Sequence, residues 1–302
     1  MSVYDLLKKQ SYMIGVPSRD RSFMIGKKTG VWKYLSEDYP LCLVVRESEA
    51  QGYHVALTTE FSVGCVKLVM DDATIAVKRN GLIEEAIRRG VDHLFILDDD
   101  VALYFRDENL SSKYTSRAED FERMEAFDRI LYECICLCNE KYPIVGLPLK
   151  QGSFNLLYTF PKNIPIIRFV CYHIPTLKKE GIKATGLNTT FMSDRFVHLS
   201  LLQKGYMGLS NCRWCVGDPG TGYRGGCSIT RTVNLQEEAA KLLTQAFPEA
   251  VTLKMKENGL WSERRLDCSI KWKHYLPEGE QGWIPLQEGL DMIRSKGDGY
   301  DV

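Results

Sequence analysis

Short apolar segments rich in β-branched residues alternate along this chain with amphipathic segments, and that alternation limits the folds open to it. Residues 13–17, 41–45, 66–70 and 93–97 are each predicted to form a strand. Residues 74–89 are predicted to form a helix, because apolar side chains recur there at helical spacing before a glycine that suits a helix end. Strands that alternate with helices indicate an α/β domain.

The second half of the chain continues this pattern less regularly. Helices are predicted over residues 118–141, 194–204 and 235–247, and a strand over residues 144–149. Neither an internal repeat nor a low-complexity linker divides the 302 residues. One continuous domain is therefore favoured over two independent ones.

Composition narrows the class of protein. With 44% hydrophobic and 26% charged residues the chain is close to an average globular protein, which excludes a disordered, collagen-like or disulfide-scaffold chain. It has no signal-like N-terminus and no apolar run near the ~20 residues that span a bilayer. We expect a soluble cytoplasmic protein with no membrane partner and with its ten cysteines kept as thiols. Cys212 and Cys215 form one C-x-x-C pair, which without a second pair is a weak zinc signal.

The charge of the chain is unevenly distributed. Lys and Arg number 39 and Asp and Glu number 39, a net charge of zero that taken alone argues against a nucleic-acid partner. Residues 141–235, however, hold 12 Lys and Arg and three acidic residues, so this basic segment carries +9 and the remainder −9. A polyanionic partner is therefore compatible with the overall balance.

The most informative motif is HLFILDDDV at residues 93–101, where a strand runs into three carboxylates. Side chains alternate along a strand, so Asp98 and Asp100 are predicted to share a face and Asp99 to point the other way. Two like charges near 4 Å repel by about 4 kcal/mol at an effective dielectric constant of about 20. Either a divalent cation such as Mg²⁺ or Mn²⁺ offsets that repulsion, or the motif is a solvated acidic loop.

Other polar residues are predicted at the same edge of the sheet. Ligands of open α/β sheets bind at the carboxyl ends of strands. A guanidinium near the start of a helix suits an anionic diphosphate. The candidate residues come from the ends of the first two strands and from the start of the helix at residues 74–89: Pro17, Ser18, Arg19, Arg21, Glu47, Arg79 and Asn80.

These motifs together resemble those of a known enzyme family. The Pro-Ser-Arg turn, the Arg-Asn helix start and the Asp-rich motif resemble GT-A-type glycosyltransferases, in which a D-x-D motif holds a metal and a nucleotide sugar. More narrowly, GVPSRDR, DDD and the later GGCSITRT, followed by a helix ending in FPEAV, are similar to TET-associated DNA glycosyltransferases, which are found largely in bacteriophages. The resemblance covers residues 12–255.

The resemblance implies a fold and an activity. The fold is a GT-A-like, Rossmann-like mixed sheet flanked by helices, in a single domain over residues 1–302. Its nucleotide-sugar-binding half covers about residues 1–110 and its acceptor half about residues 140–302. The implied reaction moves a sugar from a UDP-sugar to the hydroxyl of a 5-hydroxymethylated pyrimidine in DNA, in the cytoplasm of an infected host. A base in duplex DNA has to leave the stack for this reaction.

The resemblance also implies roles for single residues. Asp98 and Asp100 are expected to ligate Mn²⁺ or Mg²⁺, whose charge neutralises the departing diphosphate. Asp99 or Asp98 is expected to bind the ribose or the donor sugar, and Arg79 a phosphate or the sugar. The full donor-binding set is Pro17, Ser18, Arg19, Arg21, Glu47, Arg79, Asn80, Asp98, Asp99, Asp100, Asn188, Gly225, Gly226 and Arg231.

Asp194 is the candidate catalytic base, because a nearby proton acceptor assists attack by an acceptor hydroxyl. The family has an acidic pair here, whereas this chain has Ser193 before Asp194. A helix N-cap is the alternative role for Asp194. The glycine-rich residues 216–232 are either a loop that closes over the diphosphate or an ordinary surface loop.

Three further features leave alternatives open. His274 is either a third metal ligand or structural, and His198 is expected to pack. Residues 261–275 either stack on bases or form an amphipathic strand. The rival functions are transfer to a protein or carbohydrate acceptor, sugar nucleotidyl transfer, and nucleic-acid binding without catalysis. A sugar nucleotidyltransferase normally has a glycine-rich, lysine-bearing loop after the first strand, and the GVPSRDR segment of this chain is not such a loop.

Overall fold

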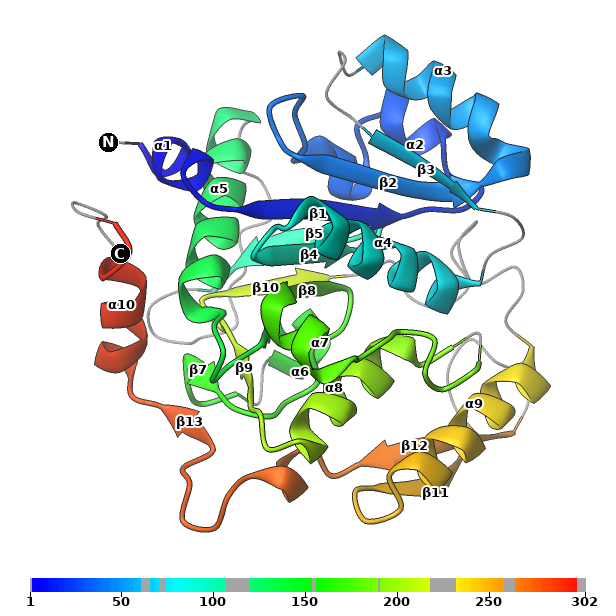
Figure 1. Cartoon of the computed structure of the whole chain (residues 1–302), viewed down its shortest axis with the longest axis vertical. Coiled ribbons are helices and arrows are strands. Elements are labelled where there is room, and N and C mark those ends of the chain that lie inside the picture. Colours follow the sequence, from blue (N-terminus) through cyan, green and yellow to red (C-terminus); the bar gives the residue numbers. More distant parts are fainter. Residues whose placement is uncertain are drawn as a thin grey trace.

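The computed structural model describes residues 2–60, 66–70, 74–106, 120–153, 156–189, 191–217, 232–257 and 264–297. Within them the chain forms a seven-stranded sheet with helices on both faces (Figure 1). The predicted fold class, a mixed α/β sheet flanked by helices, is confirmed.

The sheet has the strand order β3-β2-β1-β4-β8-β6-β9. Strands β1 to β4 are parallel to one another, β8 is antiparallel to both β4 and β6, and β6 is parallel to β9. The carboxyl ends of six strands therefore lie at one edge, and β8 begins there. The bounds are β1 (Tyr12–Pro17), β2 (Leu41–Arg46), β3 (Val66–Met70), β4 (His93–Leu97), β6 (Ile144–Gly146), β8 (Phe169–His173) and β9 (Gly208–Ser210).

Two predicted elements are shorter in the structure than in the sequence pattern. The strand predicted to reach residue 149 ends at Gly146, because Pro148 has no N–H to continue the ladder. The helix predicted to reach residue 141 is α5 (Asp120–Leu137). The side-chain oxygen of Asn139 accepts hydrogen bonds from the N–H groups of Lys141 and Tyr142, and this turn replaces the last helical turn.

The other predicted helices are close to their expected bounds. They are α4 (Ile75–Arg89), α8 (Ser193–Gln203) and α9 (Val233–Ala246). Thr74 caps α4 by accepting from the N–H of Val77, and Gly90 ends it with a left-handed φ of 68°.

Several short elements were not predicted. The helical ones are α1 (Val3–Lys8), α2 (Phe23–Gly26), η1 (Gly30–Lys33), η2 (Glu47–Glu49), α3 (Ala50–Glu60), α6 (Lys150–Ser153), α7 (Ile174–Glu180), η4 (Trp272–Tyr275) and α10 (Leu286–Arg294). The strand pairs are β5 (Ala102–Phe105) with β10 (Trp214–Gly217), β7 (Phe160–Pro161) with β13 (Trp283–Ile284), and β11 (Val251–Lys256) with β12 (Arg265–Ile270). Of these strands, β12 lies within residues 261–275, where an amphipathic strand was one of the two predicted alternatives.

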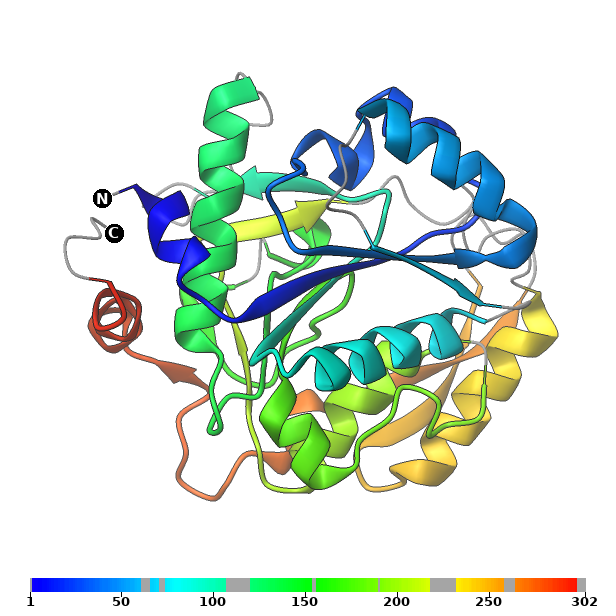
Figure 2. The ribbon, with the colours of Figure 1, turned by 45° about the horizontal axis from the view of Figure 1, so that its top comes forward.

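The alternation of β1 side chains explains the two faces of the sheet. Ile14 and Val16 belong to the large apolar cluster that includes α1 and α5, and Met13 belongs to the cluster that includes α4, α7 and α8. Figure 2 shows α4 and α5 on opposite sides of the sheet. Gly15 permits the close approach of α4, because a Cβ there would lie 2.7 Å from the Leu82 side chain. A third cluster joins α8 to α9, β11 and β12.

The described part of the chain contains no helix with the length and apolarity that crossing a membrane requires. The cysteines described by the structure, Cys212 and Cys215 included, are buried free thiols. In the same residues no group of three or more His, Cys, Asp or Glu side chains is arranged to hold a metal ion, so the C-x-x-C pair forms no zinc site there.

Candidate active site

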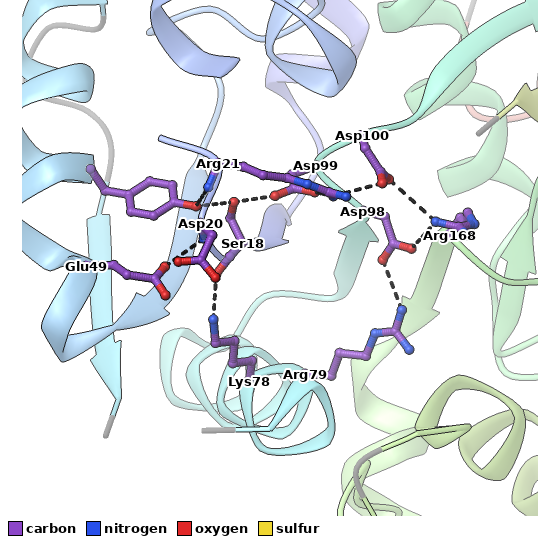
Figure 3. Close-up of polar contacts among 11 residues, drawn as sticks. Ser18, Asp20, Arg21, Glu49, Lys78, Arg79, Asp98, Asp99, Asp100 and Arg168 are labelled. Atoms are coloured by element: carbon purple, nitrogen blue, oxygen red, sulfur yellow. Dashed lines mark hydrogen bonds and ion pairs between the residues drawn. The ribbon is translucent and has the colours of Figure 1, made fainter. Parts of the chain in front are cut away.

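The acidic triplet lies where β4 ends, next to the start of β8. Leu97 pairs with Phe169, so the residue before β8, Arg168, comes beside Asp98. The N–H of Asp98 donates to the carbonyl of Arg168 at 2.9 Å. Arg168 has a left-handed φ of 67°, and its side chain turns toward the triplet (Figure 3).

Asp99 lies in a buried network at the end of β4 and shares one contact with its neighbour Asp100, because Nη1 of Arg21 pairs with both carboxylates. The Asp99 carboxylate accepts hydrogen bonds from the Ser18 hydroxyl and from the Arg21 guanidinium. Because the Ser18 proton goes to Asp99, the Tyr53 hydroxyl donates to Ser18 at 2.6 Å and accepts from the N–H of Arg21. Burial raises the pKa of Asp99 to about 6, against the opposing effect of Arg21. Asp99 thus fixes the turn after β1 to the end of β4.

Asp98 and Asp100 share a face, as predicted. The Nη1 atom of Arg168 lies 3.2 Å from Oδ2 of Asp98 and 3.5 Å from Oδ1 of Asp100. The remaining oxygen of Asp100 lies 2.8 Å from Nη1 of Arg21, and that of Asp98 lies 3.0 Å from Nη2 of Arg79. Burial and the charge of Asp98 raise the pKa of Asp100. Three guanidinium groups therefore offset the repulsion that the sequence indicated (Figure 3).

Arg79 connects the triplet to the candidate base. Besides its contact with Asp98, it lies 3.5 Å from Oδ2 of Asp194 and 3.3 Å from the Ser193 hydroxyl. Burial raises the pKa of Asp194, but Arg79 and Arg195 lower it more, so the carboxyl stays ionised at neutral pH. The helix N-cap is Met192, not Asp194, so the capping alternative for Asp194 does not hold.

Further ion pairs connect the start of α8 to strands β11 and β12. Arg195 lies 3.8 Å from Asp267 on β12, and Lys256 on β11 lies 2.7 Å from the same carboxylate. Opposite charges therefore alternate from Arg21 to Lys256. Asp194 and Arg195 are neighbours in the chain and interact through their charges, whereas the other links are ion pairs between residues separated in the sequence. We call this series the charge chain; its members are Arg21, Asp100, Arg168, Asp98, Arg79, Asp194, Arg195, Asp267 and Lys256.

The predicted donor residues Pro17, Arg19 and Glu47 lie at or just after the ends of β1 and β2, and with Asn188 they differ in exposure. Pro17 is the last residue of β1, Arg19 pairs with Asp20 at 3.3 Å, and Glu47 is exposed in η2. Asn188 is exposed, with a left-handed φ of 50°. The predicted residues Gly225, Gly226 and Arg231 lie outside the described residues.

Asn80 has a structural role. It is buried, its Oδ1 accepts from the N–H of Ala184 at 3.1 Å, and its Nδ2 donates to Glu84 at 2.8 Å. It therefore holds α4 to the segment that precedes α8.

The two histidines singled out in the sequence pack against aromatic rings. His198 is fully buried, 4.8 Å from the ring of Trp272, and neither of its ring nitrogens has a hydrogen-bond partner among the described residues. Burial lowers its pKa to about 3, as expected of a packing residue. His274 in η4 lies edge-on to Tyr275.

Three residues of the site were not predicted from the sequence: Tyr53, Lys78 and Arg168. Lys78 is almost fully buried, and its ammonium donates to the carbonyl of Ser18. The helical spacing of α4 next to Arg79 could have drawn attention to Lys78. No local pattern points to Arg168, because its place depends on the antiparallel pairing of β8 with β4.

The donor set at Asp98 and Asp100 fits a hard divalent cation. Two carboxylate oxygens, Oδ2 of Asp98 and Oδ1 of Asp100, converge on one nitrogen of Arg168. Mg²⁺ is commonly held by one or two carboxylates, with the remaining ligands supplied by phosphates and water. A cation at that point requires the Arg168 guanidinium to move.

No family model and no curated protein matches the chain. Among solved structures, the chain is similar to S. aureus TarS residues 1–349, with a TM-score of 0.42 and 9% identity over 78% of this chain and 66% of that chain. The same protein in complex with UDP gives a TM-score of 0.39 and 10% identity, with the same coverage. A mycobacterial protein gives 0.42 and 8% identity over 89% of this chain and 88% of that one.

The chain thus spans just under two thirds of these TarS chains. All three TM-scores lie below 0.5, so the function has to follow from the site itself.

Proposed function

We propose that the chain is a metal-dependent glycosyltransferase of GT-A type that uses a UDP-sugar as donor. The observation that carries the proposal is the position of Arg79 between Asp98 and Asp194. This position brings three groups together. Asp98 and Asp100 can bind a cation, the Arg79 guanidinium can bind a diphosphate, and the ionised Asp194 can accept the proton of a hydroxyl.

In the proposed reaction, the acceptor oxygen forms a bond to the anomeric carbon of the sugar while the bond from that carbon to the diphosphate breaks. Asp194 takes the proton of the attacking hydroxyl. Arg79 binds the diphosphate and orients Asp194. A bound Mn²⁺ or Mg²⁺ supplies positive charge against the charge that develops on the departing diphosphate. The buried contacts of Asp99 with Ser18 and Arg21 keep the two strand ends in place.

For the acceptor we propose a 5-hydroxymethylated pyrimidine in DNA, hydroxymethylcytosine or hydroxymethyluracil. The support is the resemblance of GVPSRDR, DDD and GGCSITRT to DNA glycosyltransferases. In this proposal the acceptor half begins near residue 140, and the chain is one catalytic domain.

A protein or carbohydrate acceptor is the second candidate, and the ion pairs of the basic segment favour it. Five of its cations pair with carboxylates from outside the segment, which offsets much of the positive charge available to a polyanion. These pairs are Lys162 with Glu280, Arg168 with Asp98 and Asp100, Lys179 with Glu140, Arg195 with Asp267, and Arg213 with Glu133.

The decisive experiment is intact-mass analysis after incubation with Mn²⁺ and a panel of sugar nucleotides. Oligonucleotides that contain hydroxymethylcytosine, hydroxymethyluracil or only unmodified bases are compared with glycans and peptides. We expect a mass gain of one sugar on a hydroxymethylated oligonucleotide, and none with the Asp100→Ala protein, provided circular dichroism shows that it is folded. A gain only on a glycan or peptide selects the second candidate. DNA binding with no gain on any acceptor indicates a nucleic-acid-binding protein without catalysis.

A further inference from the structure

The two carboxylates of the candidate cation site each have one fixed oxygen and one shared oxygen. The fixed oxygens are Oδ1 of Asp98, against Arg79, and Oδ2 of Asp100, against Arg21. The shared oxygens, Oδ2 of Asp98 and Oδ1 of Asp100, both face Nη1 of Arg168. In this structure a single guanidinium nitrogen therefore occupies the point where a cation would bind both carboxylates (Figure 3).

The Arg168 side chain is more exposed than the side chains of the other two arginines. The exposed fraction is 24% for Arg168, against 6% for Arg21 and 11% for Arg79. Its contacts of 3.2 and 3.5 Å are also longer than the 2.8 and 3.0 Å contacts of those residues with the same carboxylates. Its main chain, in contrast, is tied to β4 through the N–H of Asp98. The side chain can therefore turn away without moving the strands.

We propose that Arg168 is a diphosphate-binding residue that Asp98 and Asp100 hold until a divalent cation takes its place. A cation bound to the two shared oxygens repels a guanidinium at contact distance. The donor's diphosphate then offers Arg168 a new anionic partner within the same site. The inference rests on the proposed function, because it assumes that the donor carries a diphosphate.

The exchange has two consequences that can be measured separately. Without nucleotide, the cation has to compete with Arg168, so its affinity for the protein is low. With nucleotide, the cation releases Arg168 from the two carboxylates, and the released guanidinium binds the diphosphate. The cation and the diphosphate therefore each tighten the binding of the other. This coupling comes in addition to direct contact between the cation and the phosphates.

The first test measures Mn²⁺ binding to the full chain without nucleotide, by the electron paramagnetic resonance signal of free Mn²⁺. We expect Arg168→Gln to bind Mn²⁺ roughly tenfold more tightly than the unaltered protein, because the competing charge is gone. The matched control is Arg46→Gln, which removes one positive charge from the end of β2, where Arg46 lies 4.0 Å from Glu49. Unchanged Mn²⁺ affinity in Arg168→Gln, or an equal gain in the control, overturns the inference.

The second test measures UDP binding by calorimetry at saturating Mn²⁺. We expect Arg168→Gln to bind UDP roughly tenfold more weakly, since one charged hydrogen bond to the diphosphate is lost. Equal UDP affinity in the two proteins overturns the diphosphate role. If Arg168→Gln does not fold, Arg168→Lys replaces it; the less suitable head group is expected to give smaller changes in the same two directions.

Neither measurement depends on sugar transfer, so the inference and the proposed function fail separately. A chain that shows both effects but transfers no sugar contradicts the proposed activity alone. A chain that transfers sugar only when Mn²⁺ is present, and whose Arg168→Gln form binds Mn²⁺ and UDP as tightly as the unaltered chain does, contradicts the inference alone.

Discussion

Three consecutive aspartates at the end of β4 have three different environments. Asp99 contacts Ser18 and Arg21, Asp100 contacts Arg21 and Arg168, and Asp98 contacts Arg168 and Arg79. The strand alternation correctly placed Asp98 and Asp100 on one face, at Arg168, but the triplet follows β4 and Arg21 contacts both Asp99 and Asp100. It predicted a divalent cation or solvent as the source of charge compensation, and did not identify Arg168, because that residue lies 70 positions later in the chain than Asp98.

Asp194 is the residue on which the proposed proton transfer depends. Asp194→Asn keeps the shape of the side chain but removes its capacity to accept the proton, so we expect kcat to fall about 100-fold or more with UDP affinity little changed. Steady-state kinetics and calorimetry measure the two quantities. The neighbouring variant Ser193→Ala removes only the 3.3 Å contact to Arg79 and is the matched control. Activity retained in Asp194→Asn would assign proton transfer to another group.

His198 gives a prediction about stability and pH. Its folded pKa, about 3, lies below the ordinary value of 6.5, so the unfolded chain binds the proton more readily. Its contribution to the free energy of unfolding is therefore present above pH 6.5 and is lost as the pH falls from there toward 3. Urea unfolding should show the His198→Leu protein losing less stability than the unaltered chain between pH 7.5 and pH 5, by on the order of 1–2 kcal/mol. Parallel pH profiles of the two proteins would contradict this assignment.

Helix α4 organises the site at the level of elements. It places Lys78 against the carbonyl of Ser18, Arg79 against Asp98 and Asp194, and Asn80 against the main chain at Ala184. The apolar spacing and the glycine stop predicted this helix almost residue for residue. The sequence could not separate the roles of Arg79 and Asn80, because these depend on which element each side chain meets.

Asn80 allows the contact between α4 and the segment before α8 to be tested. Asn80→Ala leaves the N–H of Ala184 buried without its acceptor, so we expect the free energy of unfolding to fall by about 1–3 kcal/mol. Urea unfolding measures the change. The control Glu84→Ala removes only the exposed acceptor of the second Asn80 hydrogen bond, which Nδ2 donates. We expect it to lower the free energy of unfolding by less than about 0.5 kcal/mol. Equal losses in the two variants would show that the contact to Ala184 contributes nothing.

At the scale of the whole molecule, the net charge of a sequence segment differs from the charge that the folded segment leaves unpaired. Residues 141–235 carry +9, yet their cations pair with carboxylates before and after the segment in the chain. The overall α/β class followed from alternating strands and helices, which are local signals. The pairing of distant charges did not, because it is fixed by the order of strands in the sheet.

This pairing predicts that DNA binding depends less on salt than the twelve cations of the basic segment alone would indicate. Each neutralised phosphate contributes a slope of about 0.9 in the logarithm of affinity against the logarithm of salt concentration, or about 0.7 for single strands. With five of the twelve cations of the basic segment paired with carboxylates outside it, we expect a slope that corresponds to no more than about seven phosphates. Fluorescence anisotropy of a labelled oligonucleotide over a range of NaCl concentrations measures it. A slope equivalent to eight or more phosphates would mean that the ion pairs open to receive DNA.

The charge chain from Arg21 to Lys256 has a consequence for how this molecule tolerates mutation. Each interior member faces an opposite charge on either side, so a single truncation leaves partners unmatched and its measured cost includes theirs. An alanine scan of these positions would therefore overstate the importance of each side chain. Exchanges made two at a time, such as Arg195 together with Asp267, report the value of an individual link. For the same reason, homologous sequences are expected to vary in a paired way at Arg195, Asp267 and Lys256, the members to which no binding or catalytic role is assigned.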